Sequence, residues 1–342
     1  MAGVKKAFIG ETVAAIDTPE ALPGIPIEEP TVKMSFGVNT SPFAGKDGKW
    51  GTSRQLRERL NRELLTNVSL RVEETDSADT FMVAGRGELH LSILIETMRR
   101  EGFEFEVSKP EAITKMIGGK WMEPYEQLIV DTVEDFIGPV SENLSSRLAQ
   151  MTNMYNDGNG NVRMEYKIPT RGLVGFRTYF LQVTRGRGVM NSLFLDYEPI
   201  KGEVRQTRGG ALVAHEPGVA VAFGINAVQM RGSTFVEPGT PVYEGMIVGL
   251  HAREKDLVVN ICKEKKLTNM RSSTSDIGVR LTPAVKFSLE ECLDFIERDE
   301  LLEVTPKNLR MRKKILSFDD RYRHGKSSGS KESKEEEVLN EA

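Results

Sequence analysis

The apolar residues between positions 31 and 110 switch between the two-residue period of a strand and the longer period of a helix. Thr52 and Gln55 have the spacing of a capping box, and Leu56, Leu60 and Leu64 follow at every fourth position. The predicted elements are strands at 32–39, 68–74, 80–85 and 103–107, a helix that begins at Thr52, and a helix at 85–102. Their order, β-α-β-β-α-β, predicts a ferredoxin-like domain.

Residues 120–198 repeat this order. Arg86 and Arg171 lie at the start of the second predicted helix of each half, in the sequences Gly-Arg-Gly and Thr-Arg-Gly, 85 residues apart. That spacing is about the length of one such domain, so the chain is expected to hold two copies of one fold. Strands are predicted at 126–135, on both sides of the turn at 156–161, and at 189–197, with helices from Gly138-Pro139 and at 170–186.

From residue 200 onward, short apolar segments between Gly and Pro turns are typical of a small barrel-like β domain. The strand-like segments are GGALVA, GVAVAFGI, STFVEPGTPVYEGMIVGLH and KDLVVNIC. Ser288 and Glu291 predict one capped helix, and residues 301–314 predict a strand that turns and becomes strongly basic. The expected fold class is α+β, with two ferredoxin-like βαββαβ domains followed by a mainly β C-terminal domain with one helix.

The two ends of the chain differ from these domains. Residues 1–28 resemble the last strands of a small β domain followed by a proline-rich linker. Residues 317–342 have almost no apolar side chains, which predicts a disordered tail. The predicted domain boundaries are therefore 1–28, 29–112, 118–200, 201–316 and 317–342.

Composition narrows the classes of function. The chain has 342 residues and a formal net charge of −4, so any nucleic-acid binding must come from local basic patches. No apolar run approaches the roughly 18–20 residues of a membrane helix, and no membrane partner is expected. Cys262 and Cys292 are expected to be reduced thiols, and the four histidines show no metal-ligand spacing.

No motif for catalysis, a cofactor or a metal is complete. Gly325-Lys326-Ser327 lacks the first glycine of a phosphate-binding loop, because Asp320 stands five positions before Gly325. The segment that begins at Asp157 has Val162 where a calcium loop needs glycine, so it predicts a turn. No zinc box or nucleophile elbow is present, and no pair of acids stands out as a general acid and base. We therefore predict no catalytic residues, cofactor-binding residues or metal ligands.

Two basic clusters lie in the C-terminal domain and suit the neutralisation of RNA phosphates. In each case the alternative is an ordinary solvated surface. The first combines Lys263, Lys265, Lys266 and Arg271 with a single acid, Glu264. The second lies at 306–314, contains no acid, and comprises Lys307, Arg310, Arg312, Lys313 and Lys314. A third group surrounds the second helix of the second repeat, where surface charge is the favoured interpretation; it comprises Arg163, Lys167, Arg171, Arg177, Arg185 and Arg187.

Many ordered segments resemble the carboxyl-terminal half of the BipA/TypA family of translational GTPases. They include EPTVKMSFGVNTSPFAGKDGKW, GRGELHLSILIETMRREGFEFEVSKPE, IPTRGLVGFRT, VYEGMIVGLHAREKDLVVN, KKLTNMR and ELLEVTPKNLRMRKK, and span about residues 28–316. The resemblance implies that 29–112 and 118–200 correspond to domains III and V of elongation factor G. It implies that 201–316 is the C-terminal domain peculiar to the family. The GTP-binding domain of the family has no counterpart in this sequence, so GTP and Mg²⁺ are expected only in the full-length parent and no cofactor is expected in this chain.

The resemblance also implies a cytoplasmic, monomeric protein that binds the bacterial 70S ribosome and 50S subunit at the elongation-factor site. It implies contacts with rRNA and the tRNA acceptor end, and roles in stress adaptation and large-subunit assembly. In the family, a loop of the C-terminal domain reaches toward the peptidyl-transferase region. By resemblance that loop comprises Lys265, Lys266, Leu267, Thr268, Asn269, Met270 and Arg271, with Ser272 just after. Lysines there would neutralise phosphates, and Thr268 and Asn269 would hydrogen-bond sugars or bases.

Two other classes of function stay open. Paired ferredoxin-like domains can bind small molecules, so a nucleotide-binding regulatory module is the main alternative. It predicts a thermal shift with a nucleotide and no ribosome binding. An enzyme with its own active site is the third hypothesis, although no reacting constellation is visible in the sequence. Whether the chain is itself an enzyme is therefore undecided from sequence, while the full-length parent is expected to be a GTPase.

Overall fold

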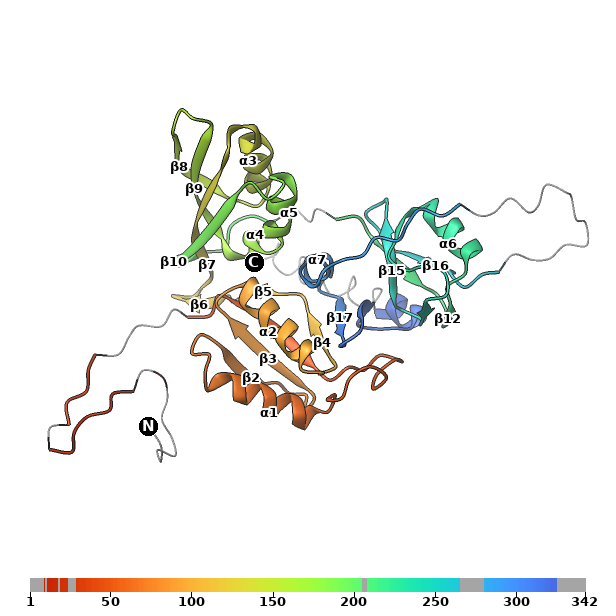
Figure 1. The fold of residues 1–342 in the computed structure, drawn as a ribbon, viewed down its shortest axis with the longest axis horizontal. Helices are drawn as coiled ribbons and strands as arrows, with labels where there is room; N and C mark the ends of the chain where they lie inside the picture. Colours follow the sequence, from red (N-terminus) through yellow and green to blue (C-terminus); the bar gives the residue numbers. More distant parts are fainter. Residues whose placement is uncertain are drawn as a thin grey trace, which may run out of the picture. The chain divides into compact units, whose positions relative to one another are not determined.

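The computed structural model describes residues 9, 11–17, 19–23, 29–204, 208–264 and 280–324. The chain divides into two compact units. The first comprises Met1–Gln206 together with Leu289–Asp294 and Val304–Asn308, and the second comprises Thr207–Ser288, Phe295–Glu303 and Leu309–Ala342. Antiparallel sheets and helices occur in both, which confirms the α+β class (Figure 1).

The first ferredoxin-like domain has the predicted order of elements. They are β1 (Val32–Gly37), α1 (Ser53–Leu64), β2 (Arg71–Glu74), β3 (Thr80–Gly85), α2 (Glu88–Arg100) and β4 (Phe105–Ser108). The antiparallel sheet runs β4-β1-β3-β2, and β5 (Glu111–Ala112) also pairs with β1. Thr52 and Gln55 form both hydrogen bonds of the predicted capping box. Phe36 and Phe105 stack in the core with ring centroids 5.7 Å apart.

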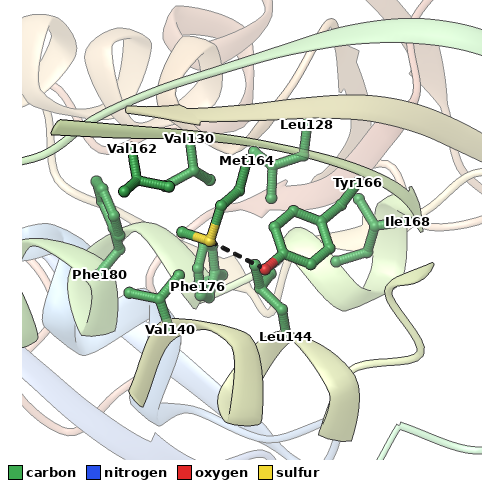
Figure 2. Packing of buried hydrophobic residues seen from close by; sticks show 10 residues of the cluster. All are labelled: Leu128, Val130, Val140, Leu144, Val162, Met164, Tyr166, Ile168, Phe176 and Phe180. Atoms are coloured by element: carbon green, nitrogen blue, oxygen red, sulfur yellow. Dashed lines mark hydrogen bonds between the residues drawn. The ribbon is translucent and has the colours of Figure 1, made fainter. Parts of the chain in front are cut away.

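The second ferredoxin-like domain follows the same plan. Its elements are β6 (Lys115–Ile117), β7 (Lys120–Val133), the 3-10 helix η1 (Glu134–Phe136), α3 (Ile137–Ser146), β8 (Gln150–Asn156), β9 (Asn161–Pro169), α4 (Thr170–Leu173), α5 (Phe176–Val183) and β10 (Val189–Pro199). The sheet runs β10-β7-β9-β8, with β6 paired to the start of β7. Figure 2 shows its core, in which β7 and β9 supply apolar side chains that face Val140 and Leu144 of α3 and Phe176 and Phe180 of α5.

Two local features of this domain differ from the sequence prediction. The helix expected at 170–186 is broken into α4 and α5 at Gly175, whose φ of +73° lies in the left-handed region. Strand β7 begins at Lys120 instead of residue 126, because its first residues form a hairpin with the unpredicted strand β6. The periodicity at 170–186 could not reveal the break, since apolar residues keep the helical spacing on both sides of it.

The second unit is mainly β, as expected. Its strands are β11 (Ala211–Ala214), β12 (Gly218–Val219), β13 (Gly232–Thr234), β14 (Pro241–Val242), β15 (Ile247–His251), β16 (Leu257–Val259), β17 (Glu300–Val304) and β18 (Leu309–Lys313). Four of them form a sheet in the order β13-β15-β11-β16, and β12 pairs with β14. The capped helix predicted at Ser288 is α7 (Leu289–Phe295), most of which belongs to the first unit.

The segment GVAVAFGI is only partly a strand, which corrects the prediction of a single helix after residue 200. Its second half begins helix α6 (Ala222–Gln229). Ile225 and Val228 are buried on one face of this helix. Gly224 lies so close to the chain that an added Cβ would be 2.3 Å from the carbonyl oxygen of Ile261. A short apolar run does not distinguish a strand from a buried helix, so the sequence favoured the wrong element here.

The chain ends are described only in part. Residues 318–324 are helical, which corrects the predicted start of the tail at residue 317. The rest of that tail, residues 325–342, lies outside the described residues. Within residues 9, 11–17 and 19–23 no strand is present, and the remainder of 1–28 lies outside the described part. Among the residues that the structure describes, no helix is long and apolar enough to cross a bilayer.

Candidate nucleic-acid interface

The basic loop implied by the family resemblance begins where the structural description stops. Residues 265–279, which include every loop residue from Lys265 to Ser272, lie outside the described part of the chain. Lys263 lies just before this gap and is exposed. The two ends of the loop are described, and both are fixed to the core of the second unit.

The N-terminal end of the loop is held at the start of α6. The backbone N–H of Val221, the N-cap residue of α6, donates to the carbonyl of Ile261 at 3.1 Å. Asn260 accepts a hydrogen bond from the backbone N–H of Cys262 at 3.0 Å and donates to Glu216 at 2.7 Å. Ile261 itself is buried. These contacts fix the backbone up to the residue before Lys263.

The C-terminal end of the loop is held at the last residue of α6. The Gln229 side chain donates to the carbonyl of Thr282 at 2.7 Å and accepts from the N–H of the same residue at 3.1 Å. The N–H of Val285 then donates to the carbonyl of Thr234 at 2.8 Å. Helix α6, which the sequence prediction missed, therefore anchors the chain on both sides of the basic loop.

The second basic cluster requires a correction, because three of its residues are structural. Arg312 is 2% exposed and Lys313 is 3% exposed, so neither side chain is available to an RNA phosphate. Arg310 is largely buried and pairs with Glu303 at 2.9 Å. Lys314 is exposed, as predicted for a surface residue. The side chains of β18 do not alternate between buried and exposed positions, since Met311, Arg312 and Lys313 are all buried.

Acids from the preceding strand and loops pair with two of these cations, Arg310 and Lys313. Lys313 Nζ lies 2.8 Å from Glu300, 2.9 Å from Asp299 and 2.5 Å from Asp256. Although burial alone would lower it, the pKa of Lys313 is raised because Glu300 and its other partners favour the charged form. Arg208 contributes a second cation, which pairs with Glu300 at 2.8 Å. Two acids in an otherwise apolar strand, ELLEV, are the sequence signal that could have predicted this pairing.

The third basic group is divided between paired and exposed side chains. Arg163 forms two hydrogen bonds to Asp131, at 2.7 and 3.0 Å. Arg171 pairs with Glu123, which is 0% exposed, and Lys167 pairs with Glu198. The remaining arginines are exposed, and no ion pair is recorded for them within the described residues; they are Arg177, Arg185 and Arg187. Half of the group therefore pairs with acids of the second ferredoxin-like domain.

The first unit also contains a cavity of about 460 Å³, the size of a small-molecule site. Arg86, Arg177 and His90 line it, and so do Glu29 and Glu290. His90 is engaged by Asn67 at 2.7 Å, and burial lowers the pKa of its imidazole. Because the carboxylates offset the two arginines, the charge of the lining does not favour a polyphosphate.

The thiols offer no additional chemistry. Both cysteines are free. Burial raises the pKa of the Cys292 thiol to about 12, so this group stays protonated at neutral pH. No cluster of His, Cys, Asp and Glu that could hold a metal ion occurs among the residues covered by the structure.

Comparisons with known proteins agree on the two C-terminal parts of the chain. Residues 209–318 match the family described as the TypA/BipA C-terminal domain, and residues 120–208 match the elongation factor G C-terminus. Proteins named large ribosomal subunit assembly factor BipA are similar over most of the chain. The Haemophilus influenzae protein is 50% identical over 96% of the chain, the Bacillus subtilis protein 50% over 95%, and the Salmonella typhimurium protein 51% over 94%. The chain spans about half the length of these relatives, 53% in each case.

Proposed function

We propose, on the premise that this chain belongs to the TypA/BipA family, that it is a ribosome-docking region of a large-subunit assembly factor. The finer part of the proposal is docking at the elongation-factor site of the 70S ribosome and the 50S subunit, with contacts to rRNA and the tRNA acceptor end. The cytoplasm would be its compartment, and stress adaptation and subunit assembly its roles. The relatives' names and the extent of the similarity support the ribosomal partner.

One observation of the structure carries the proposed RNA contact. Helix α6 fixes the chain immediately before and after the basic loop, through Val221 at one end and Gln229 at the other. Anchored ends reduce the conformational entropy that a binding loop loses on docking. The sequence between them supplies Lys265, Lys266 and Arg271, whose charges suit phosphate oxygens. In strand β18 of this unit, Arg310 and Lys313 are already paired with acids, and Arg312 is buried.

GTP and Mg²⁺ do not fit the residues of this chain. A phosphate-binding loop needs two glycines at fixed spacing before Lys-Ser/Thr, and no segment of this sequence has them. We therefore assign binding to the ribosome to this chain, and we assign no step of GTP hydrolysis to its residues. In full-length members of the family, the GTP-binding domain would hydrolyse GTP.

Co-sedimentation with 50S subunits over a series of salt concentrations tests the proposal. The parent chain should pellet with 50S in a salt-sensitive manner. The triple variant Lys265→Ala, Lys266→Ala and Arg271→Ala should bind more weakly, and its salt dependence should fall by a slope of about 2–3, since each phosphate contact contributes roughly 0.7–0.9.

The matched control is the triple variant Arg54→Ala, Arg100→Ala and Lys286→Ala. It removes the same charge from side chains that are 87%, 79% and 79% exposed. This control should bind like the parent. Equal binding by the loop variant and the parent would show that the loop assignment is wrong.

A second candidate function is supported by the 460 Å³ cavity of the first unit. A regulatory nucleotide that bound there would raise the melting temperature of the chain without any ribosome present. Although the carboxylates of the lining disfavour a polyphosphate, a large thermal shift with GTP or ATP, together with no binding to 50S, would replace the ribosomal proposal. Arg177→Ala should then abolish the shift, because Arg177 lines the cavity and has no recorded ion pair among the described residues.

A further inference from the structure

The hairpin formed by β6 and the start of β7 presents apolar side chains to solvent. Its register pairs Lys115 with Met122, Met116 with Trp121, and Ile117 with Lys120. Gly118 and Gly119 form the two-residue turn, with φ of +59° and +78°. Two successive residues with positive φ match the right-handed twist of the strands, so this turn fixes the register.

Three side chains form an apolar row across the hairpin and the neighbouring strand. Met116 and Trp121 lie directly opposite one another, and opposed residues in an antiparallel pair point to the same face. The N–H of Ile200, which follows the end of β10, donates to the carbonyl of Trp121 at 3.2 Å and continues the row. Met116 and Trp121 are each 55% exposed and Ile200 is 44% exposed. These three residues are called the Trp121 row below.

The charges beside the Trp121 row are positive. Lys120 and Lys201 are exposed, and no ion pair is recorded for either within the described residues. The nearest acids are already engaged: Glu29 with Lys115, Glu123 with Arg171, and Glu198 with Lys167. Glu203 is the exposed acid that follows Lys201. Because Lys120 pairs with Ile117, its side chain leaves the hairpin on the face opposite Trp121, so this charge lies around the edge of the row and not on it.

The hairpin is held firmly enough to position that indole. Lys115 Nζ lies 4.4 Å from the centroid of the Tyr197 ring on β10 and also pairs with Glu29. Strand β7 continues from Trp121 into the core of the second ferredoxin-like domain, where Leu128 and Val130 are fully buried. A side chain mounted on a paired strand loses little further freedom when a ligand stacks on it.

We propose that the Trp121 row is a stacking platform for an unpaired base of ribosomal RNA, with Lys120 and Lys201 adding positive charge at the edge of the hairpin. This inference rests on the proposed function, which supplies the RNA partner. Single-stranded RNA is recognised by aromatic stacking combined with backbone neutralisation, and both elements are present here. A stable protein partner would need about 20–30 residues on each side, and lysine is depleted in such interfaces.

The sequence offers a direct spectroscopic test, because Trp50 and Trp121 are its two tryptophans. In the variant Trp50→Phe, all indole emission of this chain comes from Trp121, and the emission and absorbance of the added particles or RNA are measured separately and subtracted. Titration with 50S subunits, and separately with protein-free 23S rRNA, should quench this emission as a base stacks on the ring. Quenching by 50S but not by free rRNA would identify a ribosomal protein as the occupant and overturn the proposal, as would no quenching by either.

Affinity measurements provide the second readout. Trp121→Ala should weaken binding to 50S by about 5- to 150-fold, which corresponds to the roughly 1–3 kcal/mol of one stacked base. Trp121→Phe should retain most of the affinity, since it keeps an aromatic face. Tyr155→Ala is the matched control, because Tyr155 is an aromatic residue on β8 that is 65% exposed and lies outside the platform.

The two proposals fail in different ways. If the parent binds 50S with the expected salt dependence and Trp121→Ala binds equally well, the platform is wrong and the ribosome-docking function stands. If the parent does not bind 50S at all, both proposals fall.

Discussion

The carboxyl group of Glu88 is buried beside that of Asp294 within the first unit, although the two residues lie far apart in sequence, and Asp294 raises the pKa of Glu88. Both carboxyl oxygens of Asp294 are buried and have no hydrogen-bond partner within the described part of the chain. A proton on Glu88, which the raised pKa favours, would supply a donor to this carboxyl group. Glu88 Oε2 also accepts the N–H of Gly175 at 3.1 Å, so the pair joins the start of α2, the turn between α4 and α5, and helix α7.

This pair predicts that the first unit loses stability as the pH rises. Burial, and then Asp294, raises the pKa of Glu88 well above its usual value of 4.5, while Arg147 opposes the shift. A pKa that is higher in the folded state favours folding at low pH, and that contribution is lost as the pH passes through the folded value. The melting temperature of the parent should therefore decrease as the pH rises above 4.5, the usual value for this carboxyl group.

Glu88→Gln tests the cause of this pH dependence. The amide donates to Asp294 at every pH, so the melting temperature of the variant should vary less with pH. At pH 8 the variant should be more stable than the parent by about 1–3 kcal/mol, the cost of a buried polar group without a partner. The control is Glu290→Gln, which changes an exposed residue of α7; its melting temperature should depend on pH as that of the parent does. Parallel melting curves for the parent and Glu88→Gln would rule out the shared proton.

Gly175→Ala should destabilise the first unit by about 1–2 kcal/mol in urea unfolding, because left-handed backbone is costly for alanine. The added Cβ would also lie 3.4 Å from the Asp294 carboxyl, which restricts how the turn can relax. Gly158→Ala is the matched control, since Gly158 has the same φ of +73° and open space around it. A loss at Gly175 no larger than that at Gly158 would show that contact with Asp294 contributes nothing.

Lys313→Met should destabilise the second unit by about 3–5 kcal/mol, because it leaves the fully buried Glu300 with one cation fewer. Chemical unfolding monitored by circular dichroism measures the loss. Lys314→Met is the adjacent control, and its exposed side chain predicts a change within about 0.5 kcal/mol. If both variants were equally stable, the buried network would not be the role of Lys313.

These residues also show how far sequence reasoning reaches. The helices and strands of both ferredoxin-like domains follow from apolar periodicity and the capping box at Thr52, because those signals are local. The burial of Lys313 does not follow from the local sequence, since it depends on three acids from other segments, Asp256, Asp299 and Glu300. Helix α6 was missed because its short apolar run has no strong period. The β6–β7 hairpin could have been predicted from Gly118-Gly119, because two glycines between two strand-like segments favour a two-residue turn.

The anchor between Gln229 and Thr282 predicts a defect in binding without any change of charge. Gln229→Ala removes both hydrogen bonds to the Thr282 backbone. Amide exchange at Thr282 should therefore accelerate by about 10-fold or more, since hydrogen bonds of this kind contribute roughly 0.5–1.5 kcal/mol each. Binding to 50S should weaken because more of the loop must be ordered on docking.

The salt dependence separates this effect from the loss of a phosphate contact. Gln229→Ala removes no cation, so the slope of log affinity against log salt should stay at the parent value while the affinity falls at every concentration. The variant Lys265→Ala, Lys266→Ala and Arg271→Ala should lower the slope itself. Gln127→Ala, which removes an amide from the sheet of the second ferredoxin-like domain, controls for a general loss of stability. If Gln229→Ala speeds exchange at Thr282 but leaves 50S affinity unchanged, the anchored loop ends do not contribute to docking, and the loop binds equally well when one end is released.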